Sequence, residues 1–113
     1  MVDMKDFEFV TRRKRGMATI AVYASGFVTI SGTVGKTLDK TIDFAISKDG
    51  KQVIIKNGYV FKTTPNGRLE TTNRTFSSKK ISARLDVLGI TFPAYYYCEQ
   101  QDDYWVGTLE DQQ

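Results

Sequence analysis

The chain has 113 residues, a mass of 12.8 kDa and a formal net charge of +3, which suits one compact domain with its own core. Hydrophobic residues at 41% and charged residues at 26% are globular values, so wholesale disorder is excluded. With no histidine and one cysteine, Cys98, the chain offers no Cys/His zinc site, no Ser-His-Asp triad and no intramolecular disulfide. We therefore expect a protein that is not an enzyme and that uses no cofactor or metal.

The expected compartment is the cytoplasm. No apolar run approaches the roughly 18 residues that a membrane span needs. The first six residues carry charges at positions 3, 5 and 6 and do not resemble a secretory signal peptide. A single cysteine also fits a reducing environment.

The first half of the chain has the composition of paired β-strands. Residues rich in Thr, Ile, Val and Tyr flank Ser25-Gly26, a two-residue turn typical of a hairpin. Every second residue from Ile42 to Ile46 is apolar, which predicts a strand with one buried face. The strands expected here are 7–11, 17–24, 27–31, 41–47 and 52–56, with a weaker helical turn at 33–39.

The second half is predicted to hold two more hairpins. Proline and glycine in Pro65-Asn66-Gly67 favour a tight turn, and Pro93 either places a later strand at an edge or delays its pairing until after the proline. The strands expected here are 59–63, 68–73, 92–99 and 104–109, followed by a frayed polar tail at 110–113.

A helix is predicted between these two hairpins, over residues 77–88. Ser77 is a suitable N-cap, and Phe76 with Ile81 forms the hydrophobic staple that accompanies such caps. An apolar stripe runs through Ile81, Leu85 and Leu88 at helical spacing. Gly89 then occupies the position where a left-handed residue ends a helix.

The order hairpin, short helix, hairpin occurs over residues 17–56 and again over 59–109. This predicts a mostly β fold with short helices, a β-rich α+β domain over 1–113. Its two ββαββ-like units would share a small barrel-like core. A mixed domain of this size can also show the same order of elements twice by chance. The two interpretations are therefore an internal pseudo-repeat and a chance similarity.

Charge is divided unevenly along the chain. Residues 1–84 contain all 16 Lys and Arg against 7 acids, a net charge of +9. Residues 85–113 contain no base and six acids, a net charge of −6. A basic body with an acidic end can present a positive face to phosphate, although the acidic end can equally serve only to offset the charge of the body.

The densest basic run is Arg12-Arg13-Lys14-Arg15. Four cations close together can neutralise several phosphates and release counterions, and arginine suits bidentate contact to phosphate or guanine. The alternative is a solvated loop that protects a sheet edge. The candidate DNA-binding residues are Arg12, Arg13, Lys14, Arg15, Lys36, Lys40, Lys79, Lys80 and Arg84.

Aromatic residues gather in the last fifth of the chain, among acids rather than bases. Rings that stack on nucleic-acid bases are usually paired with cations, so a stacking platform is not expected in this segment. Alternation places Phe92, Ala94, Tyr96 and Cys98 in the core, with Cys98 as an inert thiol. The outward residues could form a protein-binding surface, for which the candidates are Tyr95, Tyr97, Asp102 and Asp103.

Residues 18–56 contain a glycine turn at Gly26, a second strand with Val28 and Ile30, a helical turn with Leu38, the turn Asp49-Gly50 and a closing strand 53–56. In this pattern they resemble the swapped-hairpin DNA-binding domains of transition-state regulators and antitoxins of the AbrB/MazE kind. Ser31-Gly32 stands where that family usually has a proline, and the family's base-reading arginines are not matched. The resemblance implies a shared barrel in which two units exchange hairpins, either within one chain as a monomer or in a homodimer.

Two functions follow from these observations. The first is a small non-enzymatic regulatory protein that contacts double-stranded DNA through basic loops, as the resemblance implies. The second is an inhibitor or adaptor that binds a host protein through its aromatic-acidic surface, because the chain also resembles small proteins of bacteriophages of Gram-positive hosts. Neither function involves a membrane.

Overall fold

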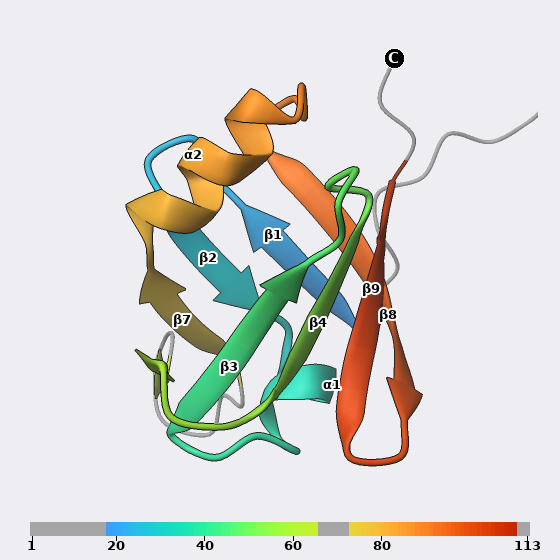
Figure 1. Ribbon diagram of the computed structural model, residues 1–113. Helices are drawn as coiled ribbons and strands as arrows, with labels where there is room; N and C mark the ends of the chain where they lie inside the picture. Colours follow the sequence, from blue (N-terminus) through green and yellow to red (C-terminus); the bar gives the residue numbers. More distant parts are fainter. Residues whose placement is uncertain (1–17, 66–72, 111–113) are drawn as a thin grey trace, which may run out of the picture.

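The computed structural model describes residues 18–65 and 73–110, and within them the chain forms nine strands in one antiparallel sheet and two short helices (Figure 1). This is a β-rich α+β fold, as the sequence predicts. In chain order the elements are β1 (Thr19–Val22), β2 (Phe27–Ile30), α1 (Gly32–Gly35), β3 (Thr41–Ile46), β4 (Gln52–Asn57), β5 (Phe61–Lys62), β6 (Thr64–Pro65), β7 (Arg74–Ser77), α2 (Lys79–Val87), β8 (Ala94–Gln101) and β9 (Tyr104–Leu109).

The sheet curves until its two ends nearly meet. Its strand order is β5-β3-β4-β9-β8-β1-β2-β7-β6, and the two outermost strands, β5 and β6, are separated in the chain only by Thr63. The Thr63 N–H donates to the carbonyl of Lys40, next to β3, over 2.7 Å. The Thr63 hydroxyl accepts a bond of 2.7 Å from Nε of Arg74 in β7. One buried residue thus connects both ends of a nearly closed, barrel-like sheet.

Hairpins from the two halves of the chain alternate around this sheet. The elements β1-β2-α1-β3-β4 and β6-β7-α2-β8-β9 each follow the order hairpin, helix, hairpin. The hairpins occur around the sheet in the order β3–β4, β9–β8, β1–β2, β7–β6, so each half separates the two hairpins of the other. If each strand is replaced by its counterpart in the other half (β1 with β6, β2 with β7, β3 with β8 and β4 with β9), the same circular order results, read in the opposite direction. An internal repeat of 17–56 in 59–109 stays a prediction, but the two halves share one core.

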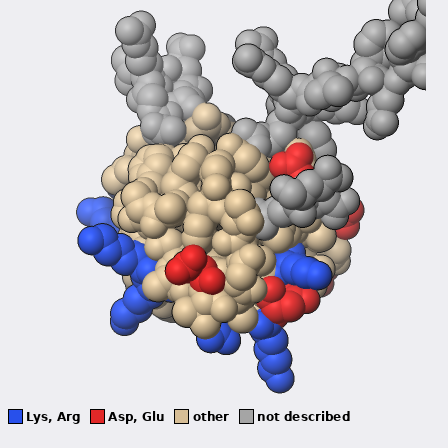
Figure 2. Space-filling model, turned by 90° about the horizontal axis from the view of Figure 1, so that it is seen from above, with Lys and Arg blue, Asp and Glu red and all other residues tan. Residues whose placement is uncertain are grey.

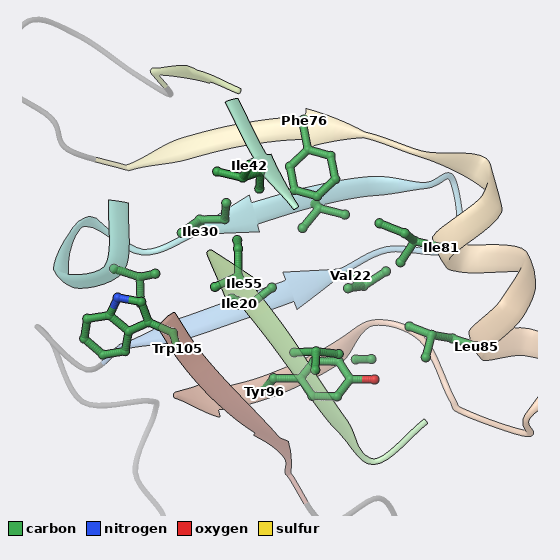
Figure 3. Packing of buried hydrophobic residues seen from close by; sticks show 14 of the residues in the cluster. Ile20, Val22, Ile30, Ile42, Ile55, Phe76, Ile81, Leu85, Tyr96 and Trp105 are labelled. Carbon is green, nitrogen blue, oxygen red and sulfur yellow. The ribbon is translucent and has the colours of Figure 1, made fainter. Parts of the chain in front are cut away.

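The core fills the space between the inner faces of the strands and runs from one helix to the other (Figure 3). Trp105 lies near the α1 end, and Ile81 and Leu85 of α2 close the opposite end. The polar atoms of the large aromatics are satisfied. Trp105 Nε1 donates to Thr37 Oγ1 over 2.9 Å, and the Tyr96 hydroxyl donates to the Gly50 carbonyl over 2.8 Å. The buried apolar residues are Ile20, Ala21, Val22, Val28, Ile30, Val34, Ile42, Val53, Ile55, Phe76, Ile81, Leu85, Ile90, Ala94, Tyr96 and Trp105.

The α2 helix begins later than the sequence predicts. Ser77 is the last residue of β7, where it pairs with Phe27 of β2, and the N-cap is Ser78. Ile81 and Leu85 are buried as expected, while Leu88 is only half-buried. The C-terminal end is as predicted. Gly89 has a φ of +81°, and the amide of Ile90 bonds back to the Leu85 carbonyl over 3.0 Å in a Schellman arrangement.

Several other boundaries differ from the prediction. The helical turn expected at 33–39 is α1 at Gly32–Gly35, and the strand expected at 59–63 is reduced to β5. The strand expected at 92–99 is β8, which starts after Pro93, as one of the two placements of that proline predicts, and it lies inside the sheet and not at an edge. The strand 68–73 was expected to pair with 59–63, but β5 pairs with β3 instead, and Asn73, the one described residue of 68–73, precedes β7. Glu110 is held rather than frayed, because its N–H donates to the Tyr95 carbonyl over 2.8 Å. The predicted strand 7–11 and residues 68–72 and 111–113 lie outside the described residues.

Truncating the buried helix residue should destabilise the fold. We expect Leu85→Ala to lower the free energy of unfolding by about 2–5 kcal/mol, because Leu85 is fully buried. The matched control is Val87→Ala on the same helix, where a side chain that is 77% exposed should change the value by less than about 0.5 kcal/mol. Urea denaturation measures both, and equal effects would mean that α2 does not pack as described.

Removing the hydroxyl of Thr63 should weaken the closure of the sheet. Thr63→Val keeps the shape of the side chain but leaves the Lys40 carbonyl and Nε of Arg74 each without one bond. We expect a loss of about 1–3 kcal/mol. The neighbouring Thr64→Val removes one bond of 3.3 Å, between Thr64 Oγ1 and Thr75 Oγ1, from an exposed residue and should cost less. A Thr63→Val protein as stable as the wild type would show that the closure does not depend on this hydroxyl.

Candidate functional site

The predicted DNA-binding residues do not form one surface. The helices lie at opposite ends of the barrel-like sheet (Figure 1). We call these the α2 end, with the β1–β2 and β3–β4 turns, and the α1 end, with the β8–β9 turn and the β4–β5 loop. Lys79, Lys80 and Arg84 are at the α2 end, whereas Lys36 and Lys40 flank α1 at the other. The separation has a topological cause, because α1 follows β2, α2 follows β7, and these two strands are antiparallel neighbours. The basic run at residues 12–15 lies outside the described residues.

The α2 end gathers five cations. Lys79, Lys80 and Arg84 are exposed on α2, and two further exposed lysines, Lys48 and Lys51, come from the β3–β4 turn. The sequence analysis missed these two, because they are far from α2 in the chain. Among the residues that the structure describes, none of the five forms an ion pair with a carboxylate.

Packing fixes the β3–β4 turn against α2. Gly50 in this turn has a φ of +76°, and a Cβ there would lie 3.0 Å from Cγ1 of Ile90, so the turn and the end of the helix are in close contact. The Gly50 carbonyl also accepts the bond from the buried Tyr96 hydroxyl. Burial, with the charge of Asp49 as a smaller cause, raises the pKa of Tyr96 to about 12, so this hydroxyl remains a donor at neutral pH.

A carboxylate organises the same turn from within. Asp49 Oδ1 accepts bonds from Ser47 Oγ over 2.7 Å and from the Lys51 amide over 2.9 Å. The hydrogen bond from Ser47, followed by that from the Lys51 amide, holds the pKa of Asp49 below its usual value. Asp49 therefore keeps its charge in the turn and fixes the backbone at Lys51.

The other end of α2 is tied to the β1–β2 turn. The Gly26 carbonyl accepts the Ser78 amide over 2.8 Å, and a Cβ on Gly26 would lie 3.0 Å from the backbone of Lys79. Between this turn and the helix lies an open groove of about 550 Å³. Its lining residues are Ala24, Ser25, Lys79, Ser82, Ala83, Asp86 and Phe92. The groove is lined mainly by small side chains, so ligands there would meet few large groups.

The two ends differ in charge. At the α2 end the five cations face three carboxylates, Asp49, Asp86 and Glu110. In Figure 2, which views this end, basic side chains project along the lower and left edges with carboxylates among them. At the α1 end five bases are balanced by five acids. The bases there are Lys36, Lys40, Lys56, Lys62 and Arg74, and the acids are Asp39, Asp43, Glu99, Asp102 and Asp103. The α2 end is therefore the more positive part of the described molecule.

The predicted protein-binding residues are also separated. Tyr95 and Tyr97 are half-buried on the outer face of β8, and the Tyr97 hydroxyl donates to Glu110 Oε1 over 3.1 Å. Asp102 and Asp103 form the β8–β9 turn at the far end of the strand. The tyrosines and the two acids thus share a hairpin but no single patch.

The inner face of β8 carries the residues expected in the core. Ala94 and Tyr96 are fully buried, and Cys98 is half-buried. Burial raises the pKa of the Cys98 thiol to about 12, so it stays protonated at neutral pH and is a poor nucleophile.

Sequence reasoning also missed an exposed pair of apolar residues. Tyr59 and Val60, expected in a strand, stand in the β4–β5 loop with 93% and 68% of their surface exposed. The turn signal Asn57-Gly58 just before them was the only indication in the sequence.

Over the described ranges 18–65 and 73–110, no group of three or more Cys, Asp or Glu residues is arranged to hold a metal ion. Within the same ranges, neither helix has the length and apolar character needed to cross a membrane.

Comparison of the chain with protein-family models, curated proteins and solved structures finds no match. The resemblance of residues 18–56 to the AbrB/MazE kind therefore stays a prediction.

The bonds of Asp49 predict a pH dependence of stability. Because its pKa is lowered in the folded state, Asp49 stabilises the fold above the pKa of about 3.8 that it has when unfolded. This contribution disappears as the pH falls through the folded pKa. We expect Asp49→Ala to lower the melting temperature at pH 7 and to match the wild type near about pH 2. Ser47→Ala, which removes the largest cause of the shift, should reduce the same pH-dependent difference. A constant difference at every pH would contradict this role.

Proposed function

We propose that the chain is a small DNA-binding regulatory protein that contacts double-stranded DNA through the basic side chains of its α2 end. The observation that supports this is the set of five exposed cations on two elements in contact, which form no ion pairs among the described residues. Cations outside ion pairs are available to phosphates, and only Lys51 of the five lies near enough to Asp49 to lower the pKa of that carboxylate. Neutralising phosphates releases counterions from DNA, which is the main source of sequence-independent affinity.

The arrangement of the cations suits this role. Lys80 and Arg84 are one helical turn apart and are therefore neighbours on the surface of α2. Arg84 can bind a phosphate in bidentate fashion, while lysines act as point charges. Lys48 and Lys51 extend the positive surface from the C-terminal part of the helix across the β3–β4 turn. The basic run 12–15 belongs to this proposal as a sequence prediction.

A second candidate function is binding to a host protein, as an inhibitor or adaptor. A shallow apolar hollow of about 160 Å³ on the outer face of the sheet favours it. The residues that line the hollow are Ala45, Ile46, Ser47, Gln52, Ile54 and Val106. In the strand register, Tyr97 is opposite Thr108, and Thr108 is opposite Gln52, so the hollow continues the aromatic surface of β8.

Charge substitution at the α2 end tests the first proposal. The triple variant Lys79→Gln, Lys80→Gln, Arg84→Gln should bind random duplex DNA more weakly than the wild type. Its plot of log K against log[salt] should be flatter by about 0.9 for each phosphate that the variant no longer neutralises. Fluorescence anisotropy of a labelled duplex over a salt series gives both values.

The matched control is Lys36→Gln, Lys40→Gln at the α1 end, which should leave the slope unchanged. Arg12→Ser with Arg13→Ser, Lys14→Ser and Arg15→Ser measures the share of the basic run separately. If the wild type does not bind duplex DNA at about 50 mM salt, the proposal is wrong and host-protein binding becomes the leading candidate. Ile54→Asp in the apolar hollow would then be the variant to compare.

A further inference from the structure

The β4–β5 loop crosses the outer face of strand β3. Both β4 and β5 pair with β3, and Asn57 and Phe61 lie opposite Ile42 on its two sides. The chain must therefore pass over β3 within residues 58–60, and Figure 1 shows this connection running across the base of β3. The crossing places these residues on the outside of the sheet, over Asp43.

Hydrogen bonds hold the crossing in one conformation. Asp43 Oδ1 accepts the amides of Tyr59 over 2.9 Å and Val60 over 3.1 Å. The Gly58 amide donates to the Thr41 carbonyl over 3.1 Å. Gly58 lies so close to the Asp43 carboxylate that a Cβ there would overlap it. Three consecutive amides are thus bonded, and the backbone of the loop is fixed.

This fixed loop presents an almost fully exposed ring. The side chain of Tyr59 is 93% exposed although its own amide is bonded to Asp43. A ring on a backbone that is already ordered loses little conformational entropy when a ligand binds. Exposed aromatics in such a position are effective binding groups.

A lysine and a second tyrosine continue the row across the sheet. Asp43 pairs with Lys56 of β4, and Lys56 pairs with Tyr104 of β9. Lys56 therefore lies on the strand between Tyr104 and the crossing over β3 that carries Tyr59. Lys56 is exposed and Tyr104 half-buried. On the other side of the crossing, exposed Lys62 pairs with Thr41, next to exposed Lys40.

The carboxylates near this row determine the direction in which a bound polyanion would extend. Bonds from the Tyr59 and Val60 amides, with the charge of Lys56 as a smaller cause, hold the pKa of Asp43 below its usual value, and Gly58 of the loop lies against this carboxylate. Asp102 and Asp103 stand in the turn just beyond Tyr104, where they repel an anion. A polyanion on the row would therefore extend from Tyr104 past Lys56 and Tyr59 toward Lys62, away from the acidic turn.

We propose that the row of Tyr104, Lys56 and Tyr59, extended by Lys62 and Lys40, is a binding site for single-stranded nucleic acid. Bases stack on the two rings, and the lysines between and beyond them neutralise the phosphates. Tyr104 belongs to the segment without bases in which the sequence predicts no stacking platform, but Lys56 of the neighbouring strand supplies a cation beside it. The alternation of rings and cations favours nucleic acid over a protein partner, which would instead use Tyr59 with Val60 as an apolar anchor. The site is on the α1 half of the molecule and shares no residue with the proposed duplex-binding surface.

Binding of a labelled oligothymidine of about 20 nucleotides, followed by fluorescence anisotropy, tests the proposal. Tyr59→Ala should weaken binding by about tenfold, because one stacking ring is removed, whereas Tyr59→Phe should bind like the wild type. Lys56→Gln should flatten the salt dependence by about 0.7, the value for one neutralised phosphate of a single strand. Val87→Ala, an exposed change at the opposite end, serves as the control and should have no effect.

Three results would overturn the proposal: no binding of the oligothymidine at about 50 mM salt, wild-type binding by Tyr59→Ala, or equally weakened binding in Tyr59→Ala and Tyr59→Phe. If the oligothymidine is not bound but Tyr59→Ala and Val60→Ala each abolish capture of a host protein, the loop is a protein anchor and the proposal is also wrong. The α2 triple variant separates the two sites. It should lose duplex binding while keeping its affinity for the oligothymidine, so either proposal can fail without the other.

Discussion

Strand β3 has consecutive segments of the same chain on both of its sides, β4 and β5, and this arrangement determines much of the remaining structure. After crossing β3, the chain reaches Thr63, which binds the Lys40 carbonyl on one side and Arg74 of β7 on the other. A nearly closed sheet leaves few unpaired edges, and unpaired edges promote association with other chains. The crossing itself needs a carboxylate at Asp43 to satisfy the loop amides and a glycine at position 58 to fit above it.

The alternation of hairpins explains why the distribution of charge along the sequence differs from its distribution over the surface. Because α1 follows β2 and α2 follows β7, its antiparallel neighbour, the two helices lie at opposite ends. Lys40 and Lys48 are only eight positions apart, yet strand β3 carries them to opposite ends of the molecule. Conversely, Lys48 and Arg84 are distant in the chain but belong to elements in contact. A division of charge by residue number therefore says little about which cations share a face.

Local signals in the sequence predicted local structure well. The turns at Ser25-Gly26 and Lys48-Asp49-Gly50, the alternation from Ile42 to Ile46 and the helix end at Gly89 each depend on a few adjacent residues. What failed depends on pairing between distant segments. Ser77 reads as a helix cap, but its pairing with Phe27 makes it a strand residue.

Tyr59 and Val60 show the same limit at a candidate site. Their β-propensity favours a strand, and the sequence predicts one at 59–63. The simultaneous pairing of β4 and β5 with β3 overrides this preference, because residues 58–60 must span the width of a strand. Their exposure follows from that crossing, which no periodicity within the segment encodes.

In both halves of the chain, a backbone hydrogen bond holds the residue that follows the last strand. The Gly58 amide, after β4, bonds to Thr41 at the start of β3, and the Glu110 amide, after β9, bonds to Tyr95 near the start of β8. The side-chain hydrogen bonds at these two places have opposite directions, because the strand side chain accepts in one and donates in the other. At the α1 end the strand supplies the carboxylate of Asp43 to backbone amides, whereas at the α2 end the Tyr97 hydroxyl of the strand donates to the carboxylate of Glu110.

This reversal determines which rings are available for binding. Asp43 binds the backbone amide of Tyr59 and not its side chain, so the Tyr59 ring projects into solvent. A tyrosine hydroxyl that binds a carboxylate is itself part of the contact, so Tyr97 lies half-buried against its own hairpin. Six of the 14 aromatic residues lie in the last fifth of the sequence, yet the most exposed large hydrophobic side chain among the described residues is Tyr59. The accessible aromatic surface is thus set by hydrogen bonding at the two strand ends and not by the density of rings along the chain.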